Sequence, residues 1–360
     1  MKKQNRGRRV AARPDPGAWL AEVRHSFDSA AQASGNLQER TIAIGPHVIR
    51  LRFAGPAMIG PFLPAVEHLV IASARVPNLT VLIWDSASTQ TPLPPFPWSA
   101  RDYGARGQIG GYNDGRYFTN YDVEWGLLSM LDCRQALALV WMQDARKTPR
   151  YVSGAPLRTV LGWWMESCGS FIVHAAAIGT EQGGALLIGR SGSGKSTTAL
   201  TALDSDLCFA GDDCCSVSLQ SGPLVHSLYN SAKVDPEDLH RTPSLARAVA
   251  TSIGELDKKK SVFFLYRYFP ERIAREFPLR VLLLPRLTNR PETTTAPARA
   301  ASAFKALAPS TMLLRPGPGP EAFRVMCELV STMPAYHLEL GTDMARIPAV
   351  IAGLLASLHA

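Results

Sequence analysis

The first 150 residues contain short apolar runs broken by turn residues, a pattern that predicts a mixed helix and strand region. Residues 18–33 have the apolar spacing of a short amphipathic helix. Runs rich in β-branched residues predict strands at 41–44, 48–53 and 78–84. Gly45-Pro46 separates the first two runs and predicts that they form a hairpin. Residues rich in Ser, Thr, Pro or Gly predict a loop at 86–100 and turns between short strands at 102–146.

After residue 155 the strand-like runs alternate with segments of helical spacing, which predicts an α/β sheet. Helices are expected at 157–168, 195–203, 323–332 and 347–358. Strands are expected at 171–178, 185–188, 207–210, 216–219, 224–228, 281–284 and 336–340. Residues 291–302 are rich in Thr, Ala and Pro and predict a loop.

Proline and glycine clusters near 147–155 mark the expected boundary between the two regions, and a chain of 360 residues suits two domains. The sequence therefore predicts a basic tail at 1–17, an N-terminal α+β domain of unknown role at 18–150, and an α/β domain at 151–360. The first thirteen residues hold six basic side chains and no acid. Such a tail should be disordered, because it has too little apolar surface to bury.

Most of the formal charge of +8 lies in this tail, and the remainder of the chain is close to neutral. A near-neutral body disfavours a nucleic-acid partner. The tail is interpreted as a solubilising segment, with contact to nucleic acid or to an acidic partner as the alternative. No apolar run is long enough to span a membrane. Arg8-Arg9 is not followed by the apolar stretch of an export signal, and the six cysteines form no C-x-x-C pair. We therefore predict a cytoplasmic protein without a zinc site or a disulfide framework.

One motif carries specific chemistry. A strand-like run leads into a loop that fits G-x-x-x-x-G-K-[ST] in full, and a helical segment follows. The glycines let backbone N–H groups wrap closely around phosphate, and the helix start adds partial positive charge. We expect ATP or GTP with Mg²⁺ here, Lys195 on the outer phosphates and Ser196 on the metal; a chance match by a flexible turn is the alternative. The residues of this expected nucleotide cradle are Gly189, Arg190, Ser191, Gly192, Ser193, Gly194, Lys195, Ser196 and Thr197.

Two further sites are candidates for chemistry beside the cradle. Asp212 and Asp213 follow the predicted strand at 207–210, and ligands in open α/β sheets bind beyond the carboxyl ends of strands. One carboxylate can hold Mg²⁺ with Ser196, for which Asp213 is the candidate, and a carboxylate can also accept a hydroxyl proton. A solvated turn is the alternative interpretation. His174 lies in an apolar strand, where a buried structural histidine is the usual role.

His174, the cradle and Asp212-Asp213, in this order and spacing, resemble the catalytic core of the HPr kinase/phosphorylase family. The broader group includes relatives that accompany peptide-modification clusters such as those for lasso peptides. The resemblance covers residues 155–230. It implies a P-loop domain of the PEP-carboxykinase-like type, ATP and Mg²⁺ as cofactors, and a protein Ser hydroxyl as acceptor. It also implies an aspartate base, His174 near the phosphates, and a homo-oligomer.

Two departures from the family pattern narrow this expectation. The bifunctional enzymes carry Glu after the cradle Ser, whereas this chain has Thr197, and their second acidic-basic signature is absent from 231–280. We therefore expect the forward kinase reaction rather than the phosphorylase reaction. Lys233 and the basic run at 258–260 can meet phosphate or an acidic peptide; for the run, a solvated loop is the favoured interpretation.

These features favour an ATP-dependent serine kinase acting on a protein or peptide. A nucleotide-binding regulatory or scaffold module without turnover is the alternative, with the N-terminal domain as its partner platform. A nucleic-acid-dependent NTPase is a third, weaker hypothesis because the body of the chain is near neutral.

Overall fold

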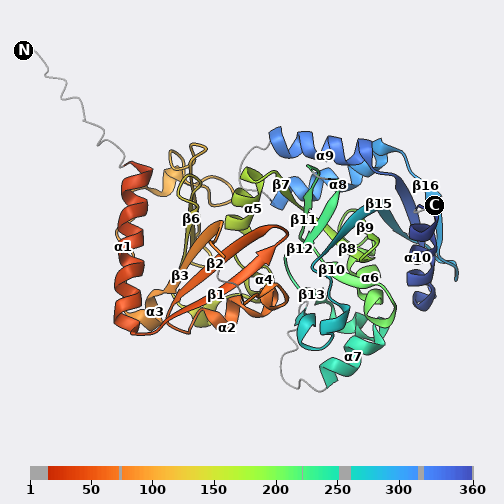
Figure 1. Cartoon of the computed structure of the whole chain (residues 1–360), viewed down its shortest axis with the longest axis horizontal. Helices are drawn as coiled ribbons and strands as arrows, with labels where there is room; N and C mark the ends of the chain where they lie inside the picture. Colours follow the sequence, from red (N-terminus) through yellow and green to blue (C-terminus); the bar gives the residue numbers. More distant parts are fainter. Residues whose placement is uncertain (1–14, 73–74, 221, 251–260, 315–319, 359–360) are drawn as a thin grey trace, which may run out of the picture.

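The computed structural model describes residues 15–72, 75–220, 222–250, 261–314 and 320–358. Within them the chain is a mixed α/β protein with several sheets. Figure 1 shows an N-terminal part, coloured red to yellow, beside a C-terminal part, coloured green to blue. The expected tail at 1–17 lies mostly outside the described residues, as does the basic run at 258–260. Among the described residues, no helix has both the length and the apolar character needed to cross a membrane.

The N-terminal part is built on a sheet with the strand order β1-β2-β3-β6-β5-β4. Its strands are β1 (Leu37–Ile44), β2 (His47–Ala54), β3 (Leu79–Asp85), β4 (Tyr117–Asp122), β5 (Leu127–Asp132) and β6 (Leu137–Met142). The helical segments are α1 (Pro16–Ser34), α2 (Ile59–Phe62), η1 (Pro64–Leu69), α3 (Ser86–Thr89), η2 (Ala100–Asp102) and η3 (Ala145–Lys147). The predicted hairpin is confirmed, since β1 and β2 pair antiparallel through the turn at Gly45.

Side chains along these strands point alternately to the two faces of the sheet, and both faces are packed against other parts of the protein. One face carries Trp84, Leu139 and their neighbours, and these pack against the buried side of α1. That helix begins two residues before the predicted start, because the Asp15 carboxylate accepts the N–H of Ala18 and Pro16 occupies the first turn. The opposite face carries Ile49, Val81 and other apolar residues that point toward the C-terminal part.

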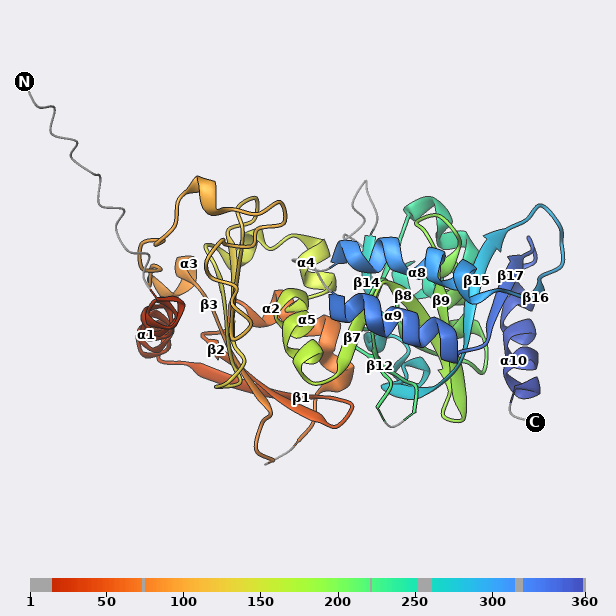
Figure 2. The same cartoon turned by 90° about the horizontal axis from the view of Figure 1, so that it is seen from above.

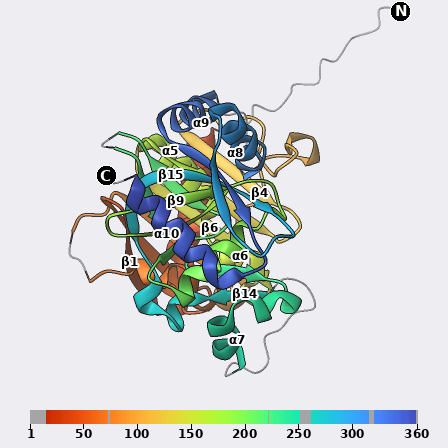
Figure 3. The ribbon, with the colours of Figure 1, turned by 90° about the vertical axis from the view of Figure 1, so that its right-hand side faces the viewer.

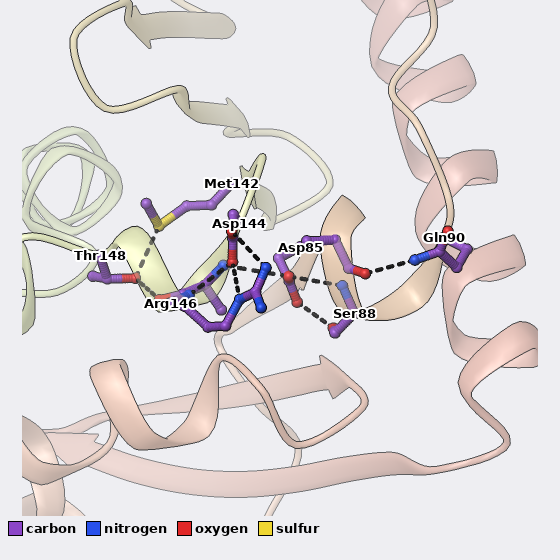
Figure 4. Close-up of polar contacts among 9 residues, drawn as sticks. Asp85, Ser88, Gln90, Met142, Asp144, Arg146 and Thr148 are labelled. Atoms are coloured by element: carbon purple, nitrogen blue, oxygen red, sulfur yellow. Dashed lines mark hydrogen bonds and ion pairs between the residues drawn. The ribbon is translucent and has the colours of Figure 1, made fainter.

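A buried carboxylate joins the loops at one edge of this sheet. Asp85 ends β3, and its carboxylate accepts N–H groups from Ser88 at 3.0 Å and Ala145 at 3.3 Å. It also accepts the Ser88 hydroxyl. Figure 4 shows Asp85 between these two loops, with Arg146 paired to Asp144 beside it. These contacts are those of a structural cap, so we assign this cluster no further role.

The C-terminal part is built on a larger sheet with the path β10-β8-β9-β15-β12-β11-β7, in which β17 also pairs with β15 and β16 with β17. Its strands are β7 (Ser170–Val173), β8 (Ala175–Thr180), β9 (Gly183–Ile188), β10 (Cys208–Gly211), β11 (Cys215–Ser218), β12 (Leu224–Ser227), β15 (Glu276–Leu287), β16 (Thr294–Pro297) and β17 (Ala335–Leu340). Strands β13 (Ser231–Val234) and β14 (Ser261–Phe264) pair separately.

Helices cover both faces of this sheet. The helices of this part are α4 (Arg150–Gly154), α5 (Arg158–Ser167), α6 (Lys195–Leu200), α7 (Pro243–Ala250), α8 (Ala300–Leu314), α9 (Pro320–Thr332) and α10 (Ile347–Ser357). Short 3-10 turns are η4 (Thr201–Asp204), η5 (Pro236–Arg241), η6 (Leu265–Arg267), η7 (Pro270–Arg272) and η8 (Met344–Arg346). Helices α6 and α10 pack on one face, and α8 and α9 pack on the other. Figure 3 shows α8 and α9 at one end of this part and α7 at the opposite end.

The two parts share a hydrophobic core. Leu228 and Tyr229 of the C-terminal part belong to the same buried cluster as Ile49 and Val81. Helix α5 lies in this cluster, and Figure 2 shows it between the two sheets. Hydrogen bonds also join the two parts. The Asn230 side chain of the C-terminal part donates to the carbonyl oxygens of Pro64 and Ala65 in the N-terminal part, at 2.8 and 2.9 Å. The division into domains 18–150 and 151–360 stays a prediction.

Three sequence expectations for the C-terminal part need correction. The single strand expected at 171–178 is two strands, β7 and β8, which belong to different parts of the sheet and are broken at His174. The loop expected at 291–302 contains β16 and the start of α8. The rest of α8 was not predicted, because Pro309 interrupts its sequence and hides the helical pattern.

Candidate functional site

The predicted cradle is a tight loop between β9 and α6. Gly192 and Gly194 adopt left-handed φ values of 77° and 102°, which glycine accepts without the steric cost of a Cβ. A Cβ on Gly194 would lie 2.5 Å from Cδ1 of Leu340, so the loop is also packed closely against β17. The first helical N–H groups of α6 therefore face the loop at the carboxyl edge of the sheet.

Lys195 is held inside this loop. Its side chain is only 5% exposed, and its Nζ donates to the carbonyl oxygens of Gly189 at 2.8 Å and Arg190 at 3.2 Å. The buried ammonium places a positive charge inside this loop. Positive charge in a tight loop before a helix is the arrangement that proteins use to bind phosphate.

Ser196 and Asp212 form a hydrogen-bonded pair next to the loop. Asp212 follows the end of β10, and its Oδ1 accepts the Ser196 hydroxyl at 3.0 Å. Its Oδ2 is buried and has no hydrogen-bond partner among the described residues. Burial raises the pKa of Asp212 to about 7, the charge of Asp213 adds to this rise, and the Ser196 hydrogen bond opposes it. A buried carboxylate oxygen without a partner is costly unless a ligand satisfies it.

Asp213 points elsewhere although it is the next residue. Its backbone has a left-handed φ of 62°, which is uncommon for a residue other than glycine. Its Oδ2 accepts from Lys233 Nζ at 2.9 Å, and its Oδ1 lies 3.8 Å from His174 Nε2. Burial would raise the pKa of Asp213, but the charge and hydrogen bond of Lys233 outweigh it and hold the pKa below its usual range.

His174 occupies the break between β7 and β8. Its backbone N–H donates to Thr311 Oγ1 of α8 at 3.1 Å, so it bonds to a helix instead of a neighbouring strand. The break turns its ring toward Asp213. Burial lowers the pKa of His174, although the Asp213 carboxylate works in the opposite direction. The histidine is therefore part of the site's polar cluster and not a core residue of a continuous strand.

These groups line a cleft of about 540 Å³, here called the central cleft. Its lining includes His174, Lys195, Ser196, Thr197 and Asp213 from the predicted set. Ser191, Gly192 and Gly194 also line it, whereas Gly189, Arg190 and Ser193 do not. Asp212 lies behind the cleft and lines a side cavity of about 150 Å³ together with His174 and Asp213. The volume of the central cleft is within the range of about 300–1,000 Å³ typical of ligand sites.

The donors at this site fit a magnesium ion bound together with phosphate. Ser196 and Asp212 supply a hydroxyl and a carboxylate with one unpartnered oxygen, and Mg²⁺ usually takes only one or two protein oxygens beside substrate phosphates. No group of three or more His, Cys, Asp or Glu side chains suited to a metal occurs among the described residues. Ser196 and Asp212 are the residues that would hold Mg²⁺ beside a bound phosphate.

Comparisons with known proteins add little to this geometry. No family model matches the chain, and no curated protein matches it. Among solved structures, the chain is similar to the Hpr(Ser) kinase/phosphatase from Coxiella burnetii. The identity is 9%, the TM-score is 0.30, and the match covers 52% of this chain and 99% of that one. This is a distant structural neighbour, and the interpretation of the site rests on the residues described above.

Sequence reasoning left Lys233 undecided, and the structure places it in the cluster. It lies on β13 between the buried residues Ala232 and Val234, and its Nζ contacts Asp213. A single charge within an apolar strand was the available signal, but its partner is 20 residues away in the sequence. Only the pairing of β13 with β14 beside the cleft reveals that partner.

Proposed function

We propose that the chain is a kinase that transfers the γ-phosphoryl group of ATP, bound with Mg²⁺, to a Ser hydroxyl of a protein or peptide. The observation that supports this proposal is the central cleft, which is lined by the glycine-rich loop, Lys195 and Asp213, with Asp212 directly behind it and bonded to Ser196. Phosphoryl transfer requires positioning and charge neutralisation more than covalent chemistry by the protein.

The cradle and Ser196 would hold the substrate. Backbone N–H groups of the loop and the Lys195 ammonium would bind the phosphate oxygens. Ser196 and Asp212 would hold Mg²⁺, which neutralises phosphate charge when it is bound. We assign the metal to Asp212 and not to Asp213, because the Ser196 hydroxyl donates to Asp212.

Asp213 would then accept the proton of the attacking hydroxyl. Its carboxylate is ionised and lines both the central cleft and the side cavity, so an acceptor side chain entering from the side cavity would meet it. The ammonium of Lys233 fixes one of its oxygens and leaves the other toward His174. Thr197 stands where the bifunctional family has Glu, which favours the forward reaction in this proposal.

Transfer from γ-labelled ATP to a degenerate Ser-containing peptide library, with Mg²⁺, tests the proposal. We expect labelled peptides from the wild-type chain and none from the same library with Ala in place of Ser. ATP binding without labelling of any Ser peptide would contradict the kinase proposal and favour the nucleotide-binding regulatory module. Failure of the chain to bind ATP at all would contradict both the kinase proposal and the nucleotide-binding regulatory module.

A further inference from the structure

A second cavity lies next to the central cleft and has about 740 Å³ of space, here called the distal cavity. Leu287 and Arg241 line both cavities, so the two are neighbours at the same edge of the sheet. The α6–η4 segment forms a shared wall, with Thr197 on the central cleft and Thr201 and Asp204 on the distal cavity. Thr201 follows Thr197 by four positions, and Asp204 follows Thr201 by three. These spacings place the three residues on one side of a helix.

The topology explains why the distal cavity faces the cradle. Strand β15 pairs parallel with β9 on one side and with β17 on the other. The carboxyl ends of these strands therefore lie at one edge, with the cradle after β9, Thr288-Asn289 after β15, and Gly341–Asp343 after β17. Ligands in α/β sheets bind at this edge, and a ligand longer than a phosphate chain would extend from the first loop toward the other two.

The loops that form the distal cavity are held in place before any ligand arrives. The N–H and the hydroxyl of Thr288 both donate to the carbonyl oxygen of Leu340, at 2.9 and 2.8 Å. The N–H of Gly341 donates to Thr293 Oγ1 at 2.9 Å. A Cβ on Gly341 would lie 2.3 Å from the carbonyl oxygen of Pro291, so this position is limited to glycine by packing. A cavity bounded by such fixed loops is preorganised for a ligand.

The chemistry of the lining suits a flat, partly apolar ligand. Leu287, Leu340, Met344 and Pro348 supply apolar surface. The polar and charged groups come from Asp204, His240, Arg241, Asn289 and Asp343 and from three threonines. Leu287 is 67% exposed although it is a large aliphatic side chain at the junction with the central cleft. A ligand that crosses from the cradle into the distal cavity would cover it. Mostly apolar walls with a few polar groups are typical of small-molecule sites.

We propose that the distal cavity binds the nucleobase and ribose of the nucleotide whose phosphates bind in the cradle. This inference rests on the proposed function, since it assumes that the central cleft takes the triphosphate. The base lies against Leu287 and Leu340, and the loops after β15 and β17 supply its polar contacts. Most of the binding preference for a nucleotide over a bare polyphosphate then comes from this cavity.

Calorimetric titration of the full chain with Mg-ATP and with Mg-tripolyphosphate, which lacks the base and ribose, tests the inference. The wild-type chain should bind Mg-ATP at least about tenfold more tightly, since one good apolar contact surface is worth that much. Ala345→Trp places an indole in the distal cavity from an exposed position. Ala349→Trp is the matched control, because Ala349 is exposed on α10 and does not line the distal cavity.

Ala345→Trp should weaken Mg-ATP at least about tenfold and change Mg-tripolyphosphate less than twofold, while Ala349→Trp changes neither. Equal affinity of the wild-type chain for the two ligands would overturn the inference and leave the proposed function standing. An Ala345→Trp chain that keeps its affinity for Mg-ATP, or loses both ligands equally, would overturn it as well. Absence of binding by either ligand to the wild-type chain would overturn the proposed function itself.

Discussion

Adjacent side chains at the centre of the site have different environments because of one backbone conformation. Asp212 is buried and bonded to Ser196, whereas Asp213 turns toward Lys233 and His174. The left-handed φ of Asp213 separates the two carboxylates, and Asp and Asn are the residues other than glycine that adopt this conformation most readily. Burial raises the pKa of Asp212, whereas the Lys233 ammonium lowers that of Asp213, and this difference divides their proposed roles.

Replacing Asp213 with Asn separates turnover from nucleotide binding. Asn tolerates the left-handed backbone, so the fold should persist while the proton acceptor is lost. We expect kcat for peptide phosphorylation to fall by about 10²–10⁴, the usual contribution of a general base. The Kd for Mg-ATP, measured by calorimetry, should stay within about threefold or tighten, because one negative charge beside the phosphates is gone. A variant with unchanged kcat would exclude Asp213 as the base.

Replacing Lys195 with Met tests the charge of the cradle. The ammonium is buried beside the loop carbonyls, and a hydrogen bond to a charged group contributes about 1.5–3 kcal/mol. We therefore expect the Kd for Mg-ATP to rise by about 10- to 100-fold. Lys305→Met, at an exposed position on α8, is the control and should leave the Kd unchanged. An equal effect of the two substitutions would show that Lys195 does not bind phosphate.

At the scale of elements, the cradle depends on the fit between a loop and a neighbouring strand. Gly192 and Gly194 both have left-handed φ values, but only Gly194 is packed against another element. Space around the position of a Gly192 Cβ is open, whereas a Gly194 Cβ would strike Leu340, which is buried at the end of β17. Substitutions at Gly192 and Gly194 therefore distinguish the cost of backbone strain, which both share, from the cost of close packing, which only Gly194 adds.

Gly194→Ala should cost more stability than Gly192→Ala. Both substitutions place a Cβ at an unfavourable φ, which costs about 1–2 kcal/mol. Gly194→Ala adds an overpacking cost of about 1–3 kcal/mol. Urea unfolding of the two variants measures the difference in the free energy of unfolding. Equal free energies of unfolding for the two variants would mean that β17 accommodates the extra methyl group without an overpacking cost.

At the scale of the whole molecule, a buried histidine lies between the N-terminal and C-terminal parts. His68 is on η1, and its Nδ1 accepts from Asn230 Nδ2 at 3.2 Å. Because an amide nitrogen only donates, the ring proton is on Nε2, which donates to Ser227 Oγ at 2.7 Å. Burial lowers the pKa of His68 to about 3, and the charge of Arg275 adds to the effect. The contact between the parts is therefore built around a neutral ring.

This histidine should make the fold sensitive to acid. Below pH about 6.5 the unfolded chain binds a proton at His68 that the folded chain does not bind until pH about 3. The stabilisation is fully present above pH 6.5 and is lost as the pH falls toward 3, by at most about 1.4 kcal/mol per pH unit. Urea unfolding at pH 7 and pH 5 should show a steeper loss for the wild-type chain than for His68→Gln. Parallel pH dependence in the two chains would show that His68 is not held neutral.

Local patterns predicted the features that depend on neighbouring residues. The cradle loop could be predicted because its motif places glycines at fixed spacing between a strand and a helix. The β1–β2 hairpin could be predicted because Gly45 lies between two β-branched runs. The family resemblance implied that His174 and one of the two aspartates lie near the cradle, but not that His174 faces Asp213. The continuous strand at 171–178 was wrong, since a uniformly apolar run does not show where the chain leaves one part of the sheet for another.

The sequence alone determined that a G-x-x-x-x-G-K-[ST] loop, two carboxylates and a histidine occur in one α/β region. Only the tertiary structure decided that Ser196 bonds to Asp212, that Lys233 bonds to Asp213, and that a second cavity adjoins the cradle. The physical reason is separation along the chain. The cradle is a local conformation of nine consecutive residues, whereas Lys233 and the walls of the distal cavity come from segments that meet only in the folded chain.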